Sequence, residues 1–276
     1  MTPPQNPPPP VEPIAVVIVS RNQREALERC LTALAARPGE IRSVVVDLHS
    51  SDGSLAVEEA FPAVQFIKLP KHFGTTKALN LGIRAVASDF VLLLPAPVEI
   101  AADHVLQLAA TLQVSPETGA VCPLCLSESG EALPQVSDLP APSQPDPPLR
   151  AARPGETVAC ATGPLMVRAF LLTSLQKIDE RYGDYGSQPE LCAQVRRNGK
   201  RVAVDSAARA VAFPRDESGS LARADRQLGA AAFLGKHHGI VNGLLARIRF
   251  VLAALLTFQV GTLRYLLMGQ KIDGTQ

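Results

Sequence analysis

The sequence lacks an excess of charge of either sign. It has 27 lysines and arginines against 26 aspartates and glutamates, which gives a formal net charge of +1. Proteins that bind nucleic acid usually carry a basic face, and no basic run with interleaved aromatic residues occurs here. We therefore expect no nucleic-acid partner.

Cysteine is scarce, and its spacing shows no disulfide framework. The five cysteines are an odd number spread along the chain: Cys30, Cys122, Cys125, Cys160 and Cys192. This usage is typical of buried thiols in a reducing compartment, so we expect a cytoplasmic protein. Cys122 and Cys125 form one CxxC pair without a second pair or nearby histidines, which favours a core strand over a zinc or redox site.

The first residues also lack a basic stretch followed by an apolar one, so the sequence predicts no secretory signal. Residues 1–13 are rich in proline instead. Such a composition favours a solvated polyproline II conformation, and the sequence predicts a disordered tail.

What the sequence does have, from residue 14 onward, is an alternation of short apolar strands with helical patterns. Strands are predicted at 14–20, 41–46, 64–70, 89–94 and 119–126, and helices at 24–37, 55–61, 76–87 and 101–112. The alternation predicts an α/β fold with a Rossmann-like, mainly parallel sheet and helices on both faces. Residues 127–157 are rich in Pro, Ser and Gly and are predicted to be a long flexible loop.

The C-terminal segment, 236–276, is predicted to be an apolar, amphipathic helical segment. Residues 243–269 are strongly apolar, but Arg247, Arg249 and Arg264 interrupt them, so they fall short of the roughly 20 apolar residues that cross a bilayer. One interpretation is a helix lying in the membrane interface, at the inner face of the cell membrane. The alternative is a helix packed on the domain or on another subunit.

Polar residues follow the first two predicted strands. Ser20, Arg21 and Asn22 follow the first, and Asp47, Ser50 and Asp52 follow the second. The carboxyl ends of neighbouring parallel strands usually form the crevice for a nucleotide. The alternative is that the two aspartates only cap turns. No Gly-x-Gly-x-x-Gly follows the first strand, which argues against a dinucleotide enzyme.

Five segments in order resemble the family 2 glycosyltransferases, inverting enzymes of the GT-A fold. They read "VVIVSRN", "VVVDLHSSDGS", "FGTTKALNLGIRAVASDFVLLL", "TGPLMVR" and "IDERYG…ELCAQVRRNGKRV", within residues 14–213. The resemblance implies a GT-A domain over 14–235, a nucleotide-sugar donor and a glycan or lipid acceptor. It also implies a role in cell-surface polysaccharide or glycolipid assembly.

The resemblance implies specific site residues as well. Those matching the donor-binding segments are Ser20, Arg21, Asn22, Asp47, Ser50, Asp52 and Asn80. The residues matching or nearest to the family's base catalyst are Glu190 and Asp184.

The sequence departs from the family where the chemistry would take place. Pro95 and Pro97 stand where the family has its metal-binding aspartates, so we expect no metal cofactor. Ser187 and Gln188 stand at the family's Glu-Asp pair. The family's metal-contacting histidine, expected after the strand near residue 211, has no counterpart, and His237 and His238 are expected to be exposed helix residues.

Without a metal, cationic side chains would have to neutralise the departing diphosphate, and the candidates are Arg21, Lys77 and the arginines of 215–226. Two hypotheses stay open. The protein transfers a sugar, or it is a catalytically inactive relative that serves as a nucleotide-binding or assembly subunit.

Overall fold

The computed structural model describes residues 12–174, 178–213 and 219–272. Most of the predicted N-terminal tail, together with Arg215, therefore lies outside the described residues.

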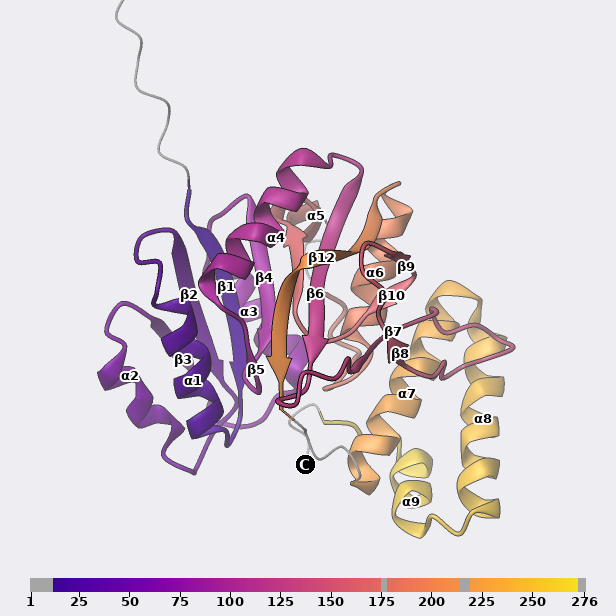
Figure 1. Ribbon diagram of the computed structural model, residues 1–276. Helices are drawn as coiled ribbons and strands as arrows, with labels where there is room; N and C mark the ends of the chain where they lie inside the picture. Colours follow the sequence, from indigo (N-terminus) through magenta and orange to yellow (C-terminus); the bar gives the residue numbers. More distant parts are fainter. Residues whose placement is uncertain (1–11, 175–177, 214–218, 273–276) are drawn as a thin grey trace, which may run out of the picture.

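A nine-stranded sheet forms the centre of the molecule, with the order β3-β2-β1-β4-β11-β6-β12-β5 and β9 paired to β12 (Figure 1). The first four strands are parallel to one another, and β12 is parallel to β6. β11 runs antiparallel between β4 and β6. The strands are β1 (Ile14–Ser20), β2 (Ile41–Asp47), β3 (Gln65–Lys68), β4 (Phe90–Pro95), β5 (Val98–Glu99), β6 (Thr118–Leu126), β9 (Thr157–Val158), β11 (Leu165–Arg168) and β12 (Arg201–Ala212). The predicted α/β fold with a mainly parallel sheet is confirmed.

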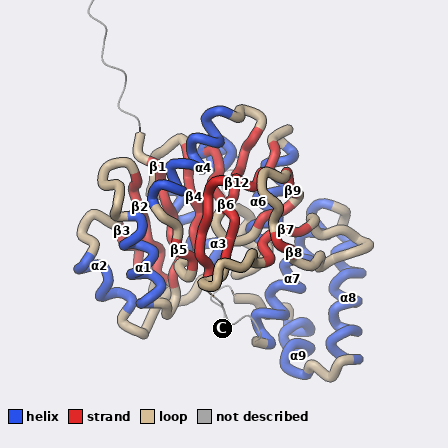
Figure 2. The backbone as a smooth tube through the Cα atoms, viewed as in Figure 1, coloured by secondary structure: helices blue, strands red, loops and turns tan. Residues whose placement is uncertain are grey.

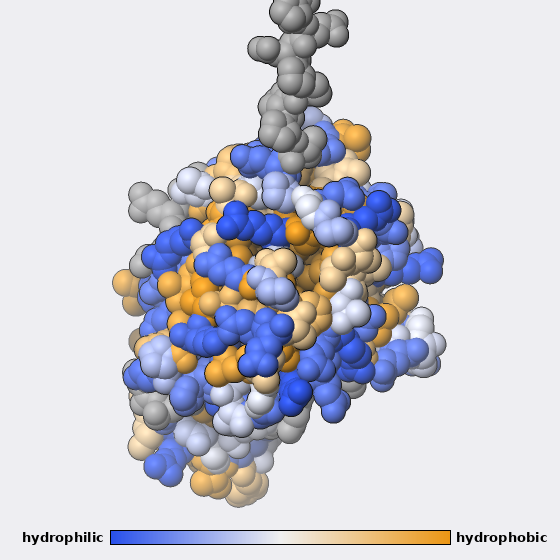
Figure 3. Space-filling view, turned by 90° about the vertical axis from the view of Figure 1, so that its left-hand side faces the viewer, coloured by the Kyte–Doolittle hydropathy of each residue, from blue (hydrophilic) through white to orange (hydrophobic). Residues whose placement is uncertain are grey.

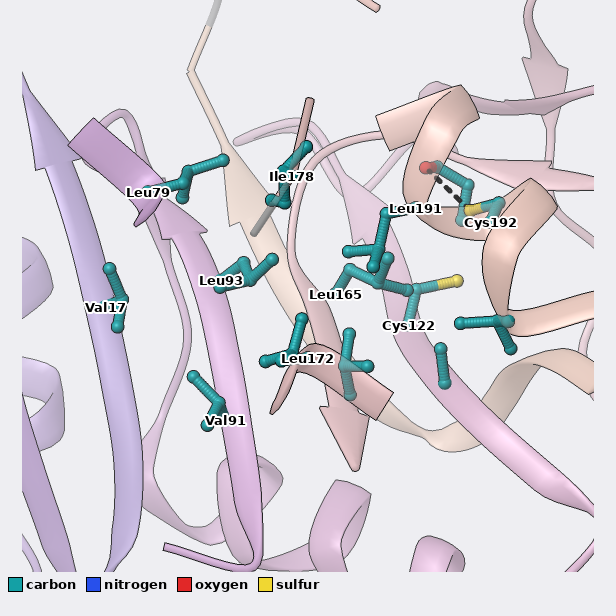
Figure 4. Packing of buried hydrophobic residues seen from close by; sticks show 14 of the residues in the cluster. Val17, Leu79, Val91, Leu93, Cys122, Leu165, Leu172, Ile178, Leu191 and Cys192 are labelled. Carbon is teal, nitrogen blue, oxygen red and sulfur yellow. Dashed lines mark hydrogen bonds between the residues drawn. The ribbon is translucent and has the colours of Figure 1, made fainter. Parts of the chain in front are cut away.

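Helices cover both faces of this sheet (Figure 2). They are α1 (Arg24–Leu34), the 3-10 turn η1 (Ser54–Ala56), α2 (Val57–Ala60), α3 (Thr75–Arg84), α4 (Ala102–Val114), α5 (Ala169–Ser174) and α6 (Ser187–Arg197). Successive strand residues point to opposite faces. Val17 and Leu93 accordingly pack in one apolar cluster with α3, α5 and α6, while Ile18 packs in the other with α1 and α4. Figure 4 shows Val17 and Leu93 in the first cluster, together with Leu191 of α6.

The five cysteines are all buried and unpaired, as the sequence predicts. Burial raises the pKa of Cys30 and Cys125 to about 12, which keeps these thiols protonated and unreactive.

Regular structure appears inside the predicted loop 127–157. β7 (Pro134–Ser137) pairs antiparallel with β8 (Arg150–Ala151) and with β10 (Cys160–Ala161) to form a second, three-stranded sheet. Gln135 anchors this sheet to the main one, because its side chain accepts from the backbone N–H of Cys125 and donates to the carbonyl of Pro123. The sequence does not predict these strands, since they are short and flanked by prolines.

Three helices follow the sheet: α7 (Ser220–His237), α8 (Ile240–Leu256) and α9 (Val260–Met268). The predicted single helix over 243–269 is therefore divided, with the break around Phe258, whose φ is 54°. α7 and α8 approach closely at Gly243, where an added Cβ would lie 2.8 Å from the carbonyl oxygen of Ala231. In Figure 1, α8 lies at the outer edge of the molecule, on the far side of α7 from the sheet. Among the described residues, none of the helices is both long and apolar enough to span a membrane.

The opposite side of the molecule, around the β3 edge of the sheet, carries interleaved hydrophilic and hydrophobic residues (Figure 3).

Candidate functional site

The carboxyl ends of β1, β2 and β4 meet at one edge of the sheet. In the register of these strands, Ser20 lies beside Asp47, and Val19 lies beside Pro95. The sequence predicts a nucleotide crevice from the polar residues after β1 and β2, and the ends of these two strands lie side by side at this edge.

Two loops at this edge are held together by hydrogen bonds between backbone and side chains. The N–H of Asn22 donates to Ser50 Oγ (2.9 Å), and the N–H of Ser51 donates back to Asn22 Oδ1 (2.8 Å). The N–H of Arg24 donates to Asp52 Oδ2 (3.0 Å). The predicted donor-binding residues Asn22, Ser50 and Asp52 thus form one interlocked pair of loops.

Asp52 stabilises its own turn. Burial alone would raise the pKa of Asp52, but hydrogen bonds from Ser54 and from the N–H of Arg24 outweigh it and lower the pKa. The capping role that the sequence left open for Asp52 is therefore present in the structure.

Asp47 lies buried at the floor of the edge. Its Oδ2 accepts from the N–H of Ser50 (2.8 Å), and its Oδ1 accepts from Ser50 Oγ (2.5 Å). An ionised carboxylate offers about four lone-pair sites, so Asp47 can accept further hydrogen bonds. Beside it, Ser20 Oγ is buried and has no hydrogen-bond partner among the described residues. Asp47 thus offers a hydrogen-bond acceptor, and the neighbouring Ser20 hydroxyl offers a donor.

Asn80 lies elsewhere, within α3 and away from solvent. Its Nδ2 donates to the carbonyl of Ile178 (2.8 Å) and to Glu180 Oε1 (3.2 Å), and its Oδ1 accepts from the N–H of Ile178 (2.8 Å). Both donor hydrogens of the amide are engaged inside the protein. A direct contact from its N–H groups to a donor sugar would require these bonds to break.

The segment after β4 does not suit a divalent cation. Ala96 is buried and its N–H donates to the carbonyl of Val19 (3.0 Å), while the carbonyl of Pro97 accepts from the N–H of Phe213 (2.9 Å). Within the described ranges, no cluster of three or more His, Cys, Asp or Glu side chains could hold a metal ion. The hard oxygen ligands that Mg²⁺ or Mn²⁺ requires are not provided at this position.

Gln188, which the sequence resemblance matches to the family's Glu-Asp pair, forms hydrogen bonds with the backbone. Its Nε2 donates to the carbonyl of Gly163 (2.6 Å), and its Oε1 accepts from the N–H of Gly163 (3.1 Å). A carboxylate could accept the second of these bonds but could not donate the first. The amide therefore matches this arrangement better than a carboxylate would.

Glu190 lies at the centre of a buried polar group, which we call the Glu190 cluster. Its carboxylate accepts from Tyr182 Oη (2.9 Å), Gln194 Nε2 (2.8 Å) and Lys236 Nζ (2.7 Å), and lies 2.7 Å from His237 Nε2. Burial raises the pKa of Glu190, but hydrogen bonds from these four side chains outweigh it and lower the pKa to about 2. A carboxylate held in this way is a poor proton acceptor.

His237 is not the exposed helix residue that the sequence predicts. Its side chain is 6% exposed, and its ring stacks on Phe233 with the centroids 4.2 Å apart. Lys236 reaches both Glu190 and Asp179, the latter at 2.9 Å. His238, in contrast, is exposed. Lys236 and His237 lie 46 and 47 residues from Glu190 in the sequence, and no local pattern could have identified these two partners.

The side chain of Asp184 caps the N-terminus of α3. Its Oδ1 accepts from the N–H and the hydroxyl of Thr75 (2.8 and 2.9 Å), and its Oδ2 lies 3.4 Å from His72 Nε2. A side chain distant in the sequence thus satisfies a free N–H of the first helical turn. Asp184 and Glu190, the two predicted base candidates, are both engaged in structural contacts.

Asp225 of α7 is a further carboxylate in this region that the sequence did not single out. Its Oδ2 accepts from the N–H groups of Asp184 (2.9 Å) and Tyr185 (3.0 Å), and its Oδ1 accepts from that of Ile272 (3.1 Å). Burial is the main reason that the pKa of Asp225 rises to about 6, and the nearby charge of Asp184 adds to it. The residue joins the loop before α6 to the C-terminal end of the described chain.

Several cationic side chains occur at the end of β1, between β3 and α3, in α3 and in α7. Arg21 is exposed at the end of β1. Lys71, between β3 and α3, and Lys77, in α3, have their Nζ atoms 5.2 and 5.7 Å from the ring centroid of Phe73. Arg226 lies over the ring of Tyr185 instead.

Comparison with known proteins identifies the family model that matches this chain. The model described as "Glycosyl transferase family 2" matches residues 15–171. No curated protein sequence matches the chain.

Solved structures of glycosyltransferases share its fold. GalNAc-T7, solved with UDP, GalNAc and Mn²⁺, is 18% identical with a TM-score of 0.61, and the match covers 74% of this chain but 44% of GalNAc-T7. TarS 1-349 from S. aureus is 17% identical with a TM-score of 0.60, covering 86% of this chain and 72% of TarS 1-349. The mannosyltransferase PcManGT from Pyrobaculum calidifontis, solved with GDP-Man and Mn²⁺, is 18% identical with a TM-score of 0.59, covering 95% of this chain and 87% of PcManGT.

Proposed function

This chain belongs to glycosyl transferase family 2, and on that basis we propose that it binds a nucleoside-diphosphate sugar at the shared edge of β1, β2 and β4. Asp47 accepts hydrogen bonds from the base or ribose, and Ser20 Oγ offers a donor beside it. Similar structures solved with UDP or GDP-Man support a donor of this class.

We further propose that the chain is a nucleotide-binding member that does not itself catalyse sugar transfer. The observation that carries this proposal is the state of Glu190, since four side chains surround it and lower its pKa to about 2. A general base works best with a pKa near the working pH and within reach of the acceptor hydroxyl. Asp184 caps α3 and Gln188 is an amide, so neither supplies a free carboxylate.

Calorimetric titration of the full chain with UDP and GDP, with and without Mn²⁺, tests the binding step. We expect dissociation constants in the micromolar to millimolar range and little dependence on Mn²⁺, because the segment after β4 offers no carboxylate to the ion. Asp47→Ala should weaken binding by about 1.5 to 3 kcal/mol, which takes a millimolar ligand out of the measurable range. The matched control Asp103→Ala, at an exposed aspartate paired with Arg37, should not. A wild-type protein that binds neither nucleotide would leave only a scaffold function.

Sugar transfer without a metal is the second candidate function. It is supported by the cationic side chains Arg21, Lys71 and Lys77, which could neutralise a departing diphosphate. The two candidates can be distinguished by incubating the protein with GDP-mannose or UDP-GlcNAc and excess chelator and measuring the nucleotide that is released. Nucleotide release above the no-enzyme rate, if Arg21→Ala abolishes it, would establish transferase or hydrolase activity. It would refute the proposal that the chain does not catalyse sugar transfer.

For the biological setting, we infer cell-surface polysaccharide or glycolipid assembly at the inner face of the cell membrane, with a glycan or lipid as the acceptor. The apolar C-terminal helices support a setting at a lipid surface. Recovery of the native chain in the membrane fraction at low salt, and its release at high salt, would support peripheral attachment.

A further inference from the structure

The exposed large apolar side chains of this molecule are concentrated on α8, α9 and the turn between them. Of the fifteen such residues among those described, twelve lie between positions 240 and 268. Phe258 is 88% exposed, Ile240 84% and Leu256 77%. The remaining three, Val114, Leu149 and Phe170, lie far apart in the sequence, in α4, before β8 and in α5.

On α8 these residues form one face. At about 100° per residue, they fall within an arc of about 160° around the helix. We call this set the apolar face: Ile240, Val241, Leu244, Leu245, Ile248, Leu252, Leu255 and Leu256. The buried residues Gly243, Ala246 and Ala254 lie on the other side, so α8 uses its small residues to pack on the protein and presents its large ones outward.

Arginines border the apolar face. The same helical geometry puts Arg249 at one border and Arg247 at the other. Arg247 donates to the carbonyl of Leu266 (2.8 Å), and Arg249 donates to that of Pro142 (3.1 Å). Each guanidinium has five N–H donors, so both retain donors for a further anionic partner.

The segment of sequence that carries the apolar face has no negative side chain. Between Asp225 and Asp273 the sequence contains neither aspartate nor glutamate, while residues 240–272 contain Arg247, Arg249, Arg264 and Lys271. The rest of the chain then has 23 basic and 26 acidic side chains, an excess of acid. The positive charge of the protein is therefore concentrated where its exposed apolar surface is.

We propose that α8 and the α8–α9 turn form a docking surface for an anionic lipid bilayer, with the apolar face inserted into the interface and the arginines at the headgroups. Charge complementarity favours a bilayer as the partner, because the arginines beside the apolar face are positive and a bilayer that contains anionic lipid is negative at its surface. Phe258 extends the apolar face into the turn between α8 and α9. The surface lies along the membrane, and the proposal does not depend on nucleotide binding.

Vesicle flotation with phosphatidylcholine alone and with added phosphatidylglycerol tests this proposal on the full chain. We expect the wild type to bind the anionic vesicles and to bind neutral ones much more weakly. Leu245→Glu/Leu252→Glu should lower the partition coefficient roughly tenfold or more, because two charges would enter the apolar interface. The matched control Val114→Glu/Phe170→Glu adds the same charge at exposed apolar positions elsewhere and should bind as the wild type does.

A second variant keeps the test independent of folding defects. Arg249→Gln/Arg264→Gln leaves the apolar face intact and should reduce the preference for phosphatidylglycerol. Equal vesicle binding by the wild type and the Leu245→Glu/Leu252→Glu variant would overturn the proposal. A wild-type dimer in light scattering that the same variant dissociates, without vesicle binding, would overturn it in favour of a second copy. Asp47→Ala should bind vesicles normally, which separates this proposal from the nucleotide site.

Discussion

Replacing Glu190 by glutamine removes the negative charge at the centre of the Glu190 cluster and nearly preserves the side-chain volume. Lys236 then retains Asp179 as its only acidic partner in the cluster, and the contact with His237 loses its charge assistance. If Glu190 is a structural anchor between α6 and α7, the substitution should lower the free energy of unfolding. If Glu190 is a catalytic base, it should lower activity with little effect on stability.

The magnitude follows from the pKa of Glu190, which falls from 4.5 to about 2. One pKa unit corresponds to about 1.4 kcal/mol, which gives about 3 kcal/mol as an upper limit, and because glutamine can keep some of the hydrogen bonds we expect about 2 kcal/mol. A carboxyl with a lowered folded-state pKa stabilises the protein above its unfolded pKa. That contribution is lost as the pH falls through the folded value, in this case between 4.5 and about 2.

Urea unfolding of the wild type and Glu190→Gln at several pH values measures this contribution. We expect the wild type to be about 2 kcal/mol more stable at neutral pH and the difference to shrink as the pH falls below 4.5. Glu28→Gln, which alters an exposed ion pair with Arg24, should change stability by less than about 0.5 kcal/mol. Equal stability of Glu190→Gln and wild type at neutral pH, or a difference independent of pH, would refute the anchoring role.

Three further outcomes are expected. Asp47→Ala should weaken nucleotide binding by about 1.5 to 3 kcal/mol in calorimetry, the size of a charge-assisted hydrogen bond, while circular dichroism stays unchanged. Gly183→Ala should lower the melting temperature, because its Cβ would lie 2.2 Å from Asp225 Oδ1 and 2.8 Å from the Ile272 carbonyl, whereas Gly219→Ala meets nothing within 4 Å. Asp225 has a raised pKa of about 6, so its contribution to stability should decline as the pH rises from 3.8 through about 6, and Asp225→Asn should flatten that part of the urea-derived stability profile.

Much of the sheet could be predicted from local sequence pattern. β1, β2 and β4 are runs of Val, Ile and Leu, and their polar ends mark the carboxyl edge because parallel strands share a direction. The same pattern could not reveal that β11 is inserted antiparallel between β4 and β6. Strand order depends on tertiary packing, and a four-residue strand carries no signal for its neighbours.

The candidate site was only partly predictable, for a related reason. Asp47 and Ser50 are three residues apart, so a turn pattern identifies their contact. Glu190 and its partner Lys236 lie on different helices, 46 residues apart. Sequence resemblance indicated Glu190 as a catalytic candidate, but its contacts with Lys236 and His237 are evident only from the position of α7 next to α6.

The carboxyl edge of β1 and β2 and the Glu190 cluster are held together by different parts of the chain. The edge is fixed by contacts within residues 20–54, such as that between Asn22 and Ser50. The cluster is fixed by α6 and α7, and none of its hydrogen bonds involves the β1 or β2 loops. Substitutions at positions without shared partners usually act additively. Substitutions at 187–190 are therefore expected to leave Asp47 and its hydrogen bonds to Ser50 unchanged, so separate variants can test the β1–β2 edge and the Glu190 cluster.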